Sequence, residues 1–152
     1  MASLPFTCVK WAMQEDFLIK IEKLADTEGQ YKREAYLFIF AALDYTVRAL
    51  NRVHAPESGR HVSGPELAWG IADYAREQYG PLARAVLEHW GMTQTIDFGR
   101  IVFSLVDAGL MRKTEEDDLS DFSDVYTFDE IFDPKRIQSK LKPIVLEQLS
   151  NT

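Results

Sequence analysis

The chain has 152 residues, of which 46% are hydrophobic and 27% are charged, and its formal net charge at pH 7 is −7. This size and apolar content suit one compact domain with a sizeable core, while the acidic balance disfavours nonspecific attachment to nucleic acid or anionic lipid. The single cysteine, Cys8, excludes an internal disulfide, no secretory signal is recognisable, and no apolar run reaches the roughly 20 residues of a membrane span. These features predict a cytoplasmic protein without membrane contact.

Two helices are predicted in the first third of the chain. Apolar residues recur at spacings of three and four, at Met13, Phe17, Ile21 and Leu24. They predict an amphipathic helix that ends near Gly29. A second helix begins near Tyr31, and its residues 35–43 are apolar without a break. Because no polar face is possible there, this helix is predicted to cross the middle of the core.

Three shorter helices are predicted next along the chain. The first begins with a capping box formed by Ser63 and Glu66, in which each side chain bonds to the backbone of the other residue. The second fills residues 81–91, between a proline start and a glycine stop. The third begins at Thr95 as its N-cap and ends at Gly109.

A β-hairpin is predicted after these helices, with strands at 110–114 and 124–128 and an acidic tip at 115–121. Helices followed by a hairpin in this order are typical of a winged helix, which we place at residues 61–128. The fold class is therefore predicted as mainly α with a small β-hairpin, an α+β class. A single compact domain should span residues 1–132, with helices added to the winged-helix-like part at both ends.

The remaining residues, 133–152, are predicted to form a helical tail. Asp133 and Pro134 can start its helix, and Pro143 should kink it. One side of the tail is basic, through Lys135, Arg136, Lys140 and Lys142. That side is either a solvated face or docks on the acidic tip of its own molecule or of a partner. A homodimer contact is possible through the apolar residues of the tail, Ile144, Val145 and Leu149.

The outward face of the predicted recognition helix is unsuited to DNA. Asp97, Arg100, Ser104 and Asp107 remain there once the apolar stripe is buried, so two carboxylates oppose one guanidinium. The acidic tip adds five carboxylates and no cation. Because DNA-binding proteins contact phosphates and base edges mainly with cations and amides, DNA binding through this element is disfavoured.

No catalytic constellation is evident in the sequence. The three histidines, His54, His61 and His89, contain no pair at the i, i+4 spacing that lets two imidazoles share a metal on a helix. Phosphate-cradling glycine-rich loops and nucleophile motifs are absent as well. An enzyme is therefore a minority interpretation, and no cofactor is predicted. A reserve hypothesis is a small metal-dependent enzyme built on Glu66, Asp73, Glu77 and His89.

Two binding functions of different classes remain. The favoured one is a non-enzymatic protein-interaction or regulatory module, because aromatic anchors ringed by charge are typical of interface hot spots. Its candidate residues are Trp69, Trp90, Glu115, Glu116, Asp117, Asp118 and Asp121. The alternative is nucleic-acid binding through a basic patch outside the recognition helix. The candidate residues of that patch are Arg48, Arg52, Arg60, His61, Arg112 and Lys113.

Short motifs are spread along residues 31–132. They are HVSGPEL at 61–67, YGP at 79–81, VLEHWG at 86–91, TIDFG at 95–99, IVF at 101–103 and AGL at 108–110, followed by KTEED at 113–117 and DF at 121–122. Together they resemble an uncharacterised bacterial family described as restricted to planctomycetes and verrucomicrobia. The tail after Asp133 departs from the family pattern. The resemblance implies a free-standing, single-domain, cytoplasmic bacterial protein and identifies no activity and no catalytic residue.

Overall fold

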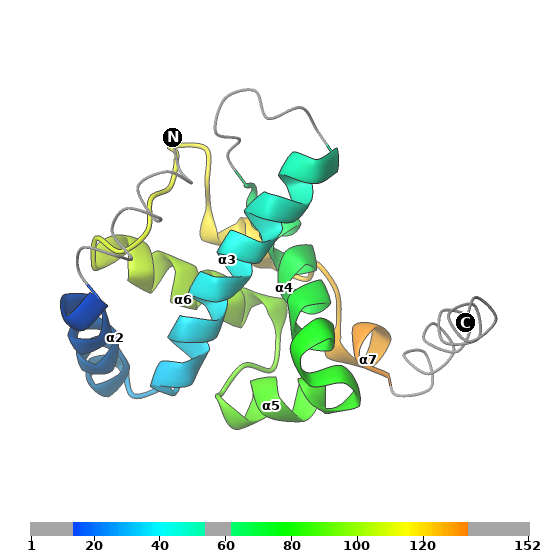
Figure 1. Ribbon diagram of the computed structural model, residues 1–152, viewed down its shortest axis with the longest axis horizontal. Coiled ribbons are helices and arrows are strands. Elements are labelled where there is room, and N and C mark those ends of the chain that lie inside the picture. Colours follow the sequence, from blue (N-terminus) through cyan, green and yellow to red (C-terminus); the bar gives the residue numbers. More distant parts are fainter. Residues whose placement is uncertain (1–13, 54–61, 134–152) are drawn as a thin grey trace, which may run out of the picture.

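A computed structural model describes residues 14–53 and 62–133 of the chain. The elements in these residues are α2 (Gln14–Glu28), α3 (Arg33–Val53), α4 (Gly64–Tyr79), the 3-10 helix η1 (Gly80–Leu82), α5 (Ala83–His89), α6 (Thr95–Asp107), the 3-10 helix η2 (Leu119–Phe122) and α7 (Phe128–Ile131). Figure 1 shows α3 and α4 side by side at the centre, with α6 crossing α3 and with α2 and α5 at the periphery.

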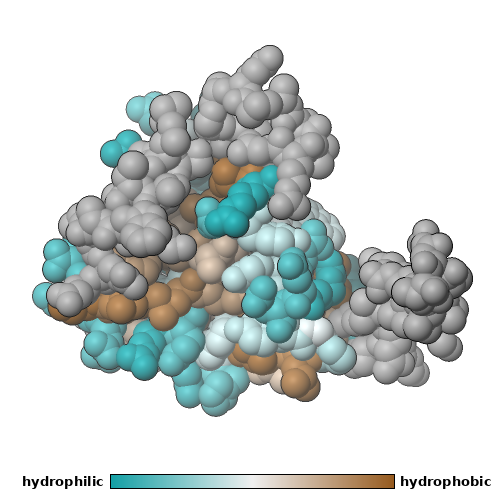
Figure 2. Space-filling view, in the orientation of Figure 1, coloured by the Kyte–Doolittle hydropathy of each residue, from teal (hydrophilic) through white to brown (hydrophobic). Residues whose placement is uncertain are grey.

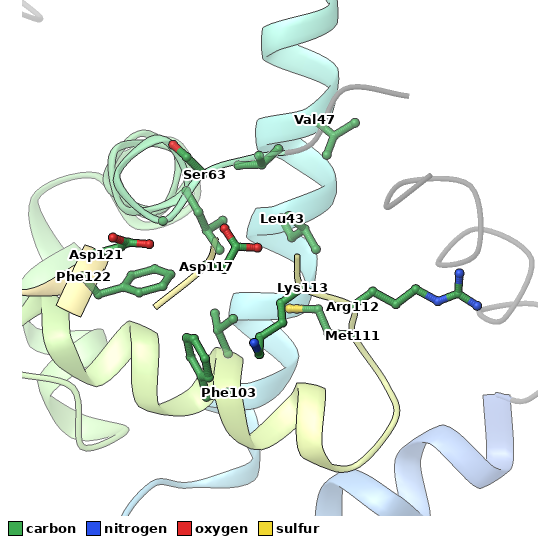
Figure 3. Close-up of a pocket in the computed structure, with 14 residues that line it drawn as sticks. Leu43, Val47, Ser63, Phe103, Met111, Arg112, Lys113, Asp117, Asp121 and Phe122 are labelled. Atoms are coloured by element: carbon green, nitrogen blue, oxygen red, sulfur yellow. The ribbon is translucent and has the colours of Figure 1, made fainter. Parts of the chain in front are cut away.

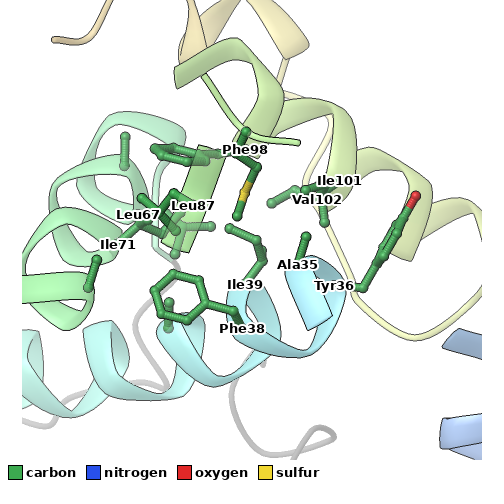
Figure 4. Close-up of a cluster of buried hydrophobic side chains, with 14 of the residues drawn as sticks. Ala35, Tyr36, Phe38, Ile39, Leu67, Ile71, Leu87, Phe98, Ile101 and Val102 are labelled. Carbon is green, nitrogen blue, oxygen red and sulfur yellow. The ribbon is translucent and has the colours of Figure 1, made fainter. Parts of the chain in front are cut away.

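The central helix is α3, as the unbroken apolar run at 35–43 predicts. It packs against α2, α4 and α6, and Ala35, Ile39 and Ala42 are fully buried. Figure 4 shows Ala35 and Ile39 directed toward Ile101 and Val102 of α6. A helix that contacts neighbours on three sides has little surface left for polar residues, which explains the composition of its first half.

The helix α4 begins as predicted, with a complete capping box. The backbone N–H of Ser63 donates to Glu66 Oε1 over 3.1 Å, and the N–H of Glu66 donates to Ser63 Oγ over 3.3 Å. Farther along, α4 crosses α3 at Gly70, where an added Cβ would lie only 1.8 Å from Thr46 Oγ1. This close crossing therefore depends on a glycine.

The predicted β-hairpin is wrong, because no residue in 14–53 or 62–133 forms a strand. The α+β class is replaced by an all-helical one, and the wing of the predicted winged helix is missing from the described chain. The reason is local hydrogen bonding in the acidic segment. The Asp117 carboxylate accepts the Thr114 N–H over 2.8 Å, and Asp121 accepts the Asp118 N–H over 3.0 Å. Side chains that bond nearby backbone in this way favour turns over a strand ladder.

The second predicted strand is also replaced by turns. Asp124 has a positive φ of 51°, which breaks an extended conformation, and from Phe128 the chain enters α7. Phe122, Tyr126 and Phe128 are buried, and η2 packs on both α4 and α6. The segment from 119 to 132 is thus an irregular cover over two helices, anchored by aromatic side chains.

The start of α6 differs from the prediction in two ways. The N-cap is Gln94 rather than Thr95. The Thr95 hydroxyl is buried and instead donates to the Phe122 carbonyl over 2.6 Å and accepts the Val125 N–H at 3.3 Å. Asp97, predicted to face outward, is only 4% exposed. The helix predicted at 81–91 is also divided, because η1 precedes α5.

The molecular surface mixes apolar and polar residues. On the face shown in Figure 2, hydrophobic residues form separate patches among hydrophilic ones. The predicted tail helix and its homodimer contact, at residues 134–152, lie outside the described residues.

Candidate functional site

An apolar cleft opens between α3, the first turn of α4 and α6. It contains about 550 Å³ of empty space, part of which is open solvent. Apolar side chains form most of its lining, namely Leu43, Val47, Val62, Leu67, Val102, Phe103, Met111 and Phe122. A concave site with this mainly apolar lining is suited to bind an apolar group.

Local sequence features position the walls of this cleft. Leu43 and Val47 are one turn apart on α3 and therefore share a face. The glycine after α6, Gly109, has a φ of 77°, a left-handed conformation that glycine adopts without strain. It lets the Leu110 N–H donate to the Leu105 carbonyl over 2.9 Å. The chain then reverses and brings Met111 to the cleft.

Charges of both signs form the rim of the cleft. Figure 3 shows Asp117 and Asp121 on one side and Lys113 on the other, while Arg112 extends away from the cleft. The Lys113 ammonium lies 5.7 Å from the centre of the Phe103 ring, a cation–π distance. Asp117 and Asp121 are held in place by the backbone N–H groups that they accept. The rim therefore has carboxylates and an ammonium group facing a common apolar floor.

The cleft brings together residues from two competing predictions. Asp117 and Asp121 belong to the predicted protein-interaction set, whereas Arg112 and Lys113 belong to the predicted nucleic-acid patch. The other acidic candidates, Glu115, Glu116 and Asp118, are exposed and do not line the cleft.

The remaining members of the predicted basic patch are not assembled by the described structure. Arg48 forms an ion pair with Asp44 on the same face of α3. The side chain of Arg52 and all of Arg60 and His61 lie outside the described residues.

The two tryptophan candidates have different surroundings. Trp69, on α4, is 47% exposed, and its ring centre lies 4.9 Å from that of Tyr126. Trp90 is partly exposed, but its ring packs on Phe38 at 5.5 Å and on Tyr79 at 5.8 Å. Of these two, Trp69 therefore presents the larger aromatic surface to solvent.

A buried polar cluster around Asp97 was missed by the sequence reasoning. Its carboxylate accepts hydrogen bonds from the Tyr31 hydroxyl at 2.6 Å, the Thr93 N–H at 2.9 Å, the Gln94 N–H at 3.1 Å and the Arg100 guanidinium at 3.1 Å. Burial, followed by the hydrogen bond to Asp97, raises the pKa of the Tyr31 phenol well above its usual range. The spacing of Gln94 and Asp97, three residues apart, was the available signal for this second capping box.

The Asp97 cluster is structural. Its carboxylate oxygens are occupied by donors from the loop before α6, from α6 itself and from the loop before α3. A carboxylate that is 4% exposed and so fully bonded has no capacity left for a substrate. Its role is to join these segments.

The reserve hypothesis of a metal site finds no geometric support in the described chain. Glu66 closes the α4 capping box, Asp73 pairs with Arg76, and His89 Nε2 lies 3.4 Å from Lys32 Nζ. Across residues 14–53 and 62–133, no three His, Cys, Asp or Glu side chains lie close enough to share a metal ion.

The described helices and the comparisons with known proteins add two findings. Each helix in 14–53 and 62–133 is too short or too polar to cross a lipid bilayer. Comparisons of the chain with models of protein families, with curated proteins and with solved structures gave no match, so the resemblance to a bacterial family stays a prediction.

Proposed function

We propose that this protein is a non-enzymatic protein-interaction module whose apolar cleft holds an apolar side chain of a partner protein. The observation that carries the proposal is the cleft itself, in which apolar side chains of α3, α4 and α6 lie around a common opening inside a rim of both charges. Interfaces between proteins have this anatomy, with an apolar centre that buries an anchor and a polar rim. A cytoplasmic location, which the sequence features together predict, is part of the same proposal.

The charge at the rim favours a protein over a nucleic acid as partner. A phosphate backbone is attracted by clustered cations and is repelled by carboxylates. At this cleft Asp117 and Asp121 lie across from Lys113, and the structure pairs Arg48 with Asp44. A protein segment can match a mixed rim because it carries side chains of either charge.

The expected contribution of the cleft is that of one or two anchors. Burying one Leu-sized or Phe-sized side chain contributes about 1.5–3 kcal/mol. Dissociation constants in the micromolar range correspond to about 8 kcal/mol. The rim and neighbouring surface must therefore add contacts, and loss of the apolar anchor should weaken binding by at least tenfold.

A site-specific photo-crosslinking experiment tests the proposal. A photoreactive residue would replace Val47 or Phe103 in the cleft, or Leu82 as a control. Leu82 is 65% exposed and does not line the cleft. We expect the same partner protein to crosslink at both cleft positions in cells of the source organism and not at the control position.

Binding of the purified partner then decides the outcome. Val47→Asp should weaken binding at least about tenfold, a change of about 1.4 kcal/mol, whereas Leu82→Asp should leave binding unchanged. Equal binding of the Val47→Asp variant and the parent would overturn the proposal, as would crosslinking at the cleft positions no stronger than at Leu82.

A further inference from the structure

We infer that α4 carries a second docking surface, centred on Trp69, which binds an arginine-rich basic segment of a protein partner. This inference goes beyond the cleft, because Trp69 does not line the cleft. The two surfaces can therefore be tested separately.

The Trp69 side chain has the exposure and the support of a preformed anchor. It is 47% exposed, whereas most large apolar side chains of the described residues are covered. Its ring rests on Tyr126, with centroids 4.9 Å apart. Tyr126 is buried, and its hydroxyl donates to the Ala68 carbonyl over 2.7 Å. Because the ring beneath it is fixed, little freedom of Trp69 remains to be lost on binding.

The segment that supports Trp69 is strongly acidic. Residues 114–133 contain nine carboxylates and no Lys or Arg, namely Glu115, Glu116, Asp117, Asp118, Asp121, Asp124, Asp129, Glu130 and Asp133. The whole chain has a net charge of −7, so the rest of it is positive by two. The negative charge of the protein is therefore concentrated in the segment that packs along α4 through η2 and Tyr126.

Part of this charge has no cation partner in the described chain. Asp129 pairs with Arg84, and Asp73 on α4 pairs with Arg76. Within residues 14–53 and 62–133, no Lys or Arg pairs with Asp118, Asp121 or Asp124. Asp124 is two residues from Tyr126 and is exposed.

An exposed aromatic ring on a helix that is packed against a carboxylate-rich segment fits a basic partner. The face of an indole ring attracts cations, and a guanidinium can also stack flat on it. The carboxylates attract further cations of the same segment and steer its approach. Nucleic acid and anionic lipid are repelled by the same charge, and an uncharged apolar helix would leave the carboxylates desolvated without partners.

Titration of the full chain with an arginine-rich peptide tests this inference. The reference probe is the same peptide with every arginine replaced by citrulline, which keeps the shape and removes the charge. Calorimetry should show binding of the arginine peptide that weakens as salt is added. The citrulline peptide should not bind.

Three variants separate a docking surface from general attraction to an acidic protein. Trp69→Leu keeps the charge and should weaken binding about fivefold, the value expected for an exposed cation–π contact. Asp124→Asn, which tolerates the positive φ, should weaken it about threefold. Asp107→Asn removes the same charge at an exposed position at the end of α6 and should change nothing.

The inference is overturned if Trp69→Leu binds like the parent, if Asp107→Asn weakens binding as much as Asp124→Asn, or if the citrulline peptide binds equally well. If Trp69→Leu does not fold, the inference is still tested by comparing Asp124→Asn with Asp107→Asn and the arginine peptide with the citrulline peptide. The cleft variant Val47→Asp should bind the arginine peptide normally. Loss of that binding would show that the two surfaces are one and would also overturn the inference, whereas failure of the cleft proposal alone would leave it standing.

Discussion

The crossing of α3 and α4 predicts that Gly70→Ala destabilises the protein, although alanine is the better helix former. A Cβ at position 70 would lie 1.8 Å from Thr46 Oγ1 and 2.8 Å from both Thr46 Cβ and Cγ2. An ordinary contact begins at 3.4 Å, so the hydroxyl would have to move by about 1.6 Å. Thr46 is 3% exposed, and its hydroxyl donates to the Ala42 carbonyl over 2.7 Å.

The size of the effect follows from three contributions. Alanine in place of glycine inside a helix stabilises by about 1 kcal/mol. Overpacking of a close contact costs about 1–3 kcal/mol, and rotation of Thr46 away from the new methyl group breaks a buried hydrogen bond that contributes about 1 kcal/mol. Because three Thr46 atoms obstruct the methyl group, we expect the high end of the overpacking range. The free energy of unfolding should fall by about 3 kcal/mol.

Urea unfolding followed by circular dichroism measures this change, and Thr46→Ala provides the matched background. That substitution removes Oγ1 and Cγ2 and leaves only the Cβ contact at 2.8 Å. In the Thr46→Ala background, Gly70→Ala should cost at least about 1 kcal/mol less than it costs alone. A Gly70→Ala variant that is about 1 kcal/mol more stable than the parent would show that helix propensity alone acts there, and the close crossing would be refuted.

Three further predictions concern stability. Asp97→Asn should lower the free energy of unfolding by about 2 kcal/mol, because an amide cannot accept from all the donors around Asp97. A loss in urea unfolding of less than about 0.5 kcal/mol would contradict a stabilising role of these hydrogen bonds. Ser63→Ala should cost about 1 kcal/mol by the same assay, since the α4 capping box is lost, and an unchanged midpoint would argue against that cap. Stability should fall as the pH rises above about 10, because burial raises the pKa of Tyr31, Tyr36 and Tyr126 in the folded state, so that the unfolded chain releases these protons first. Each such tyrosine lowers stability by up to about 1.4 kcal/mol per pH unit. Because the chain has six tyrosines, absorbance that reports ionisation of more than three of them before unfolding would contradict the direction of these shifts.

The helical part of the fold was predictable because its signals are local. The apolar run at 35–43 has no polar face, so a central position for α3 followed from the sequence alone. The capping box of Ser63 and Glu66 and the left-handed Gly109 act within one turn of chain. In each case the residues that determine the structure are neighbours in sequence.

The acidic segment was mispredicted because its signals are ambiguous. Alternating apolar and polar residues at 124–128 fit a strand. They also fit an irregular segment in which every second residue, here Tyr126 and Phe128, is buried against the helices. Tertiary contacts decide between a strand and such a segment. The Thr95 hydroxyl bonds to the backbone of Phe122 and Val125, and the Tyr126 hydroxyl donates to the Ala68 carbonyl. Aspartates that cap nearby turns then satisfy the backbone that a hairpin would have paired.

The cleft could not be found from the sequence, because its residues are ordinary core residues in any local window. Val47 and Val102 lie 55 positions apart in the numbering, and each fits the apolar stripe of its own helix. Only the crossing of α3 with α4 and α6, together with the reversal at Gly109, leaves their side chains around a common opening.

The structure also changes the argument against nucleic-acid binding. Asp97 was predicted on the outer face of a recognition helix, where it would repel phosphates, but it is buried and bonded to Tyr31 and Arg100. The repulsion of phosphates therefore comes from the segment at 114–133 rather than from α6, and Asp117 and Asp121 of this segment also bond to local backbone. The carboxylates of this segment contribute to the rim of the cleft and belong to a segment that packs on α4, so they act on a partner that approaches either surface. Raising the salt concentration should weaken binding more at Trp69 than at the cleft, because burial of apolar groups provides most of the affinity at the cleft.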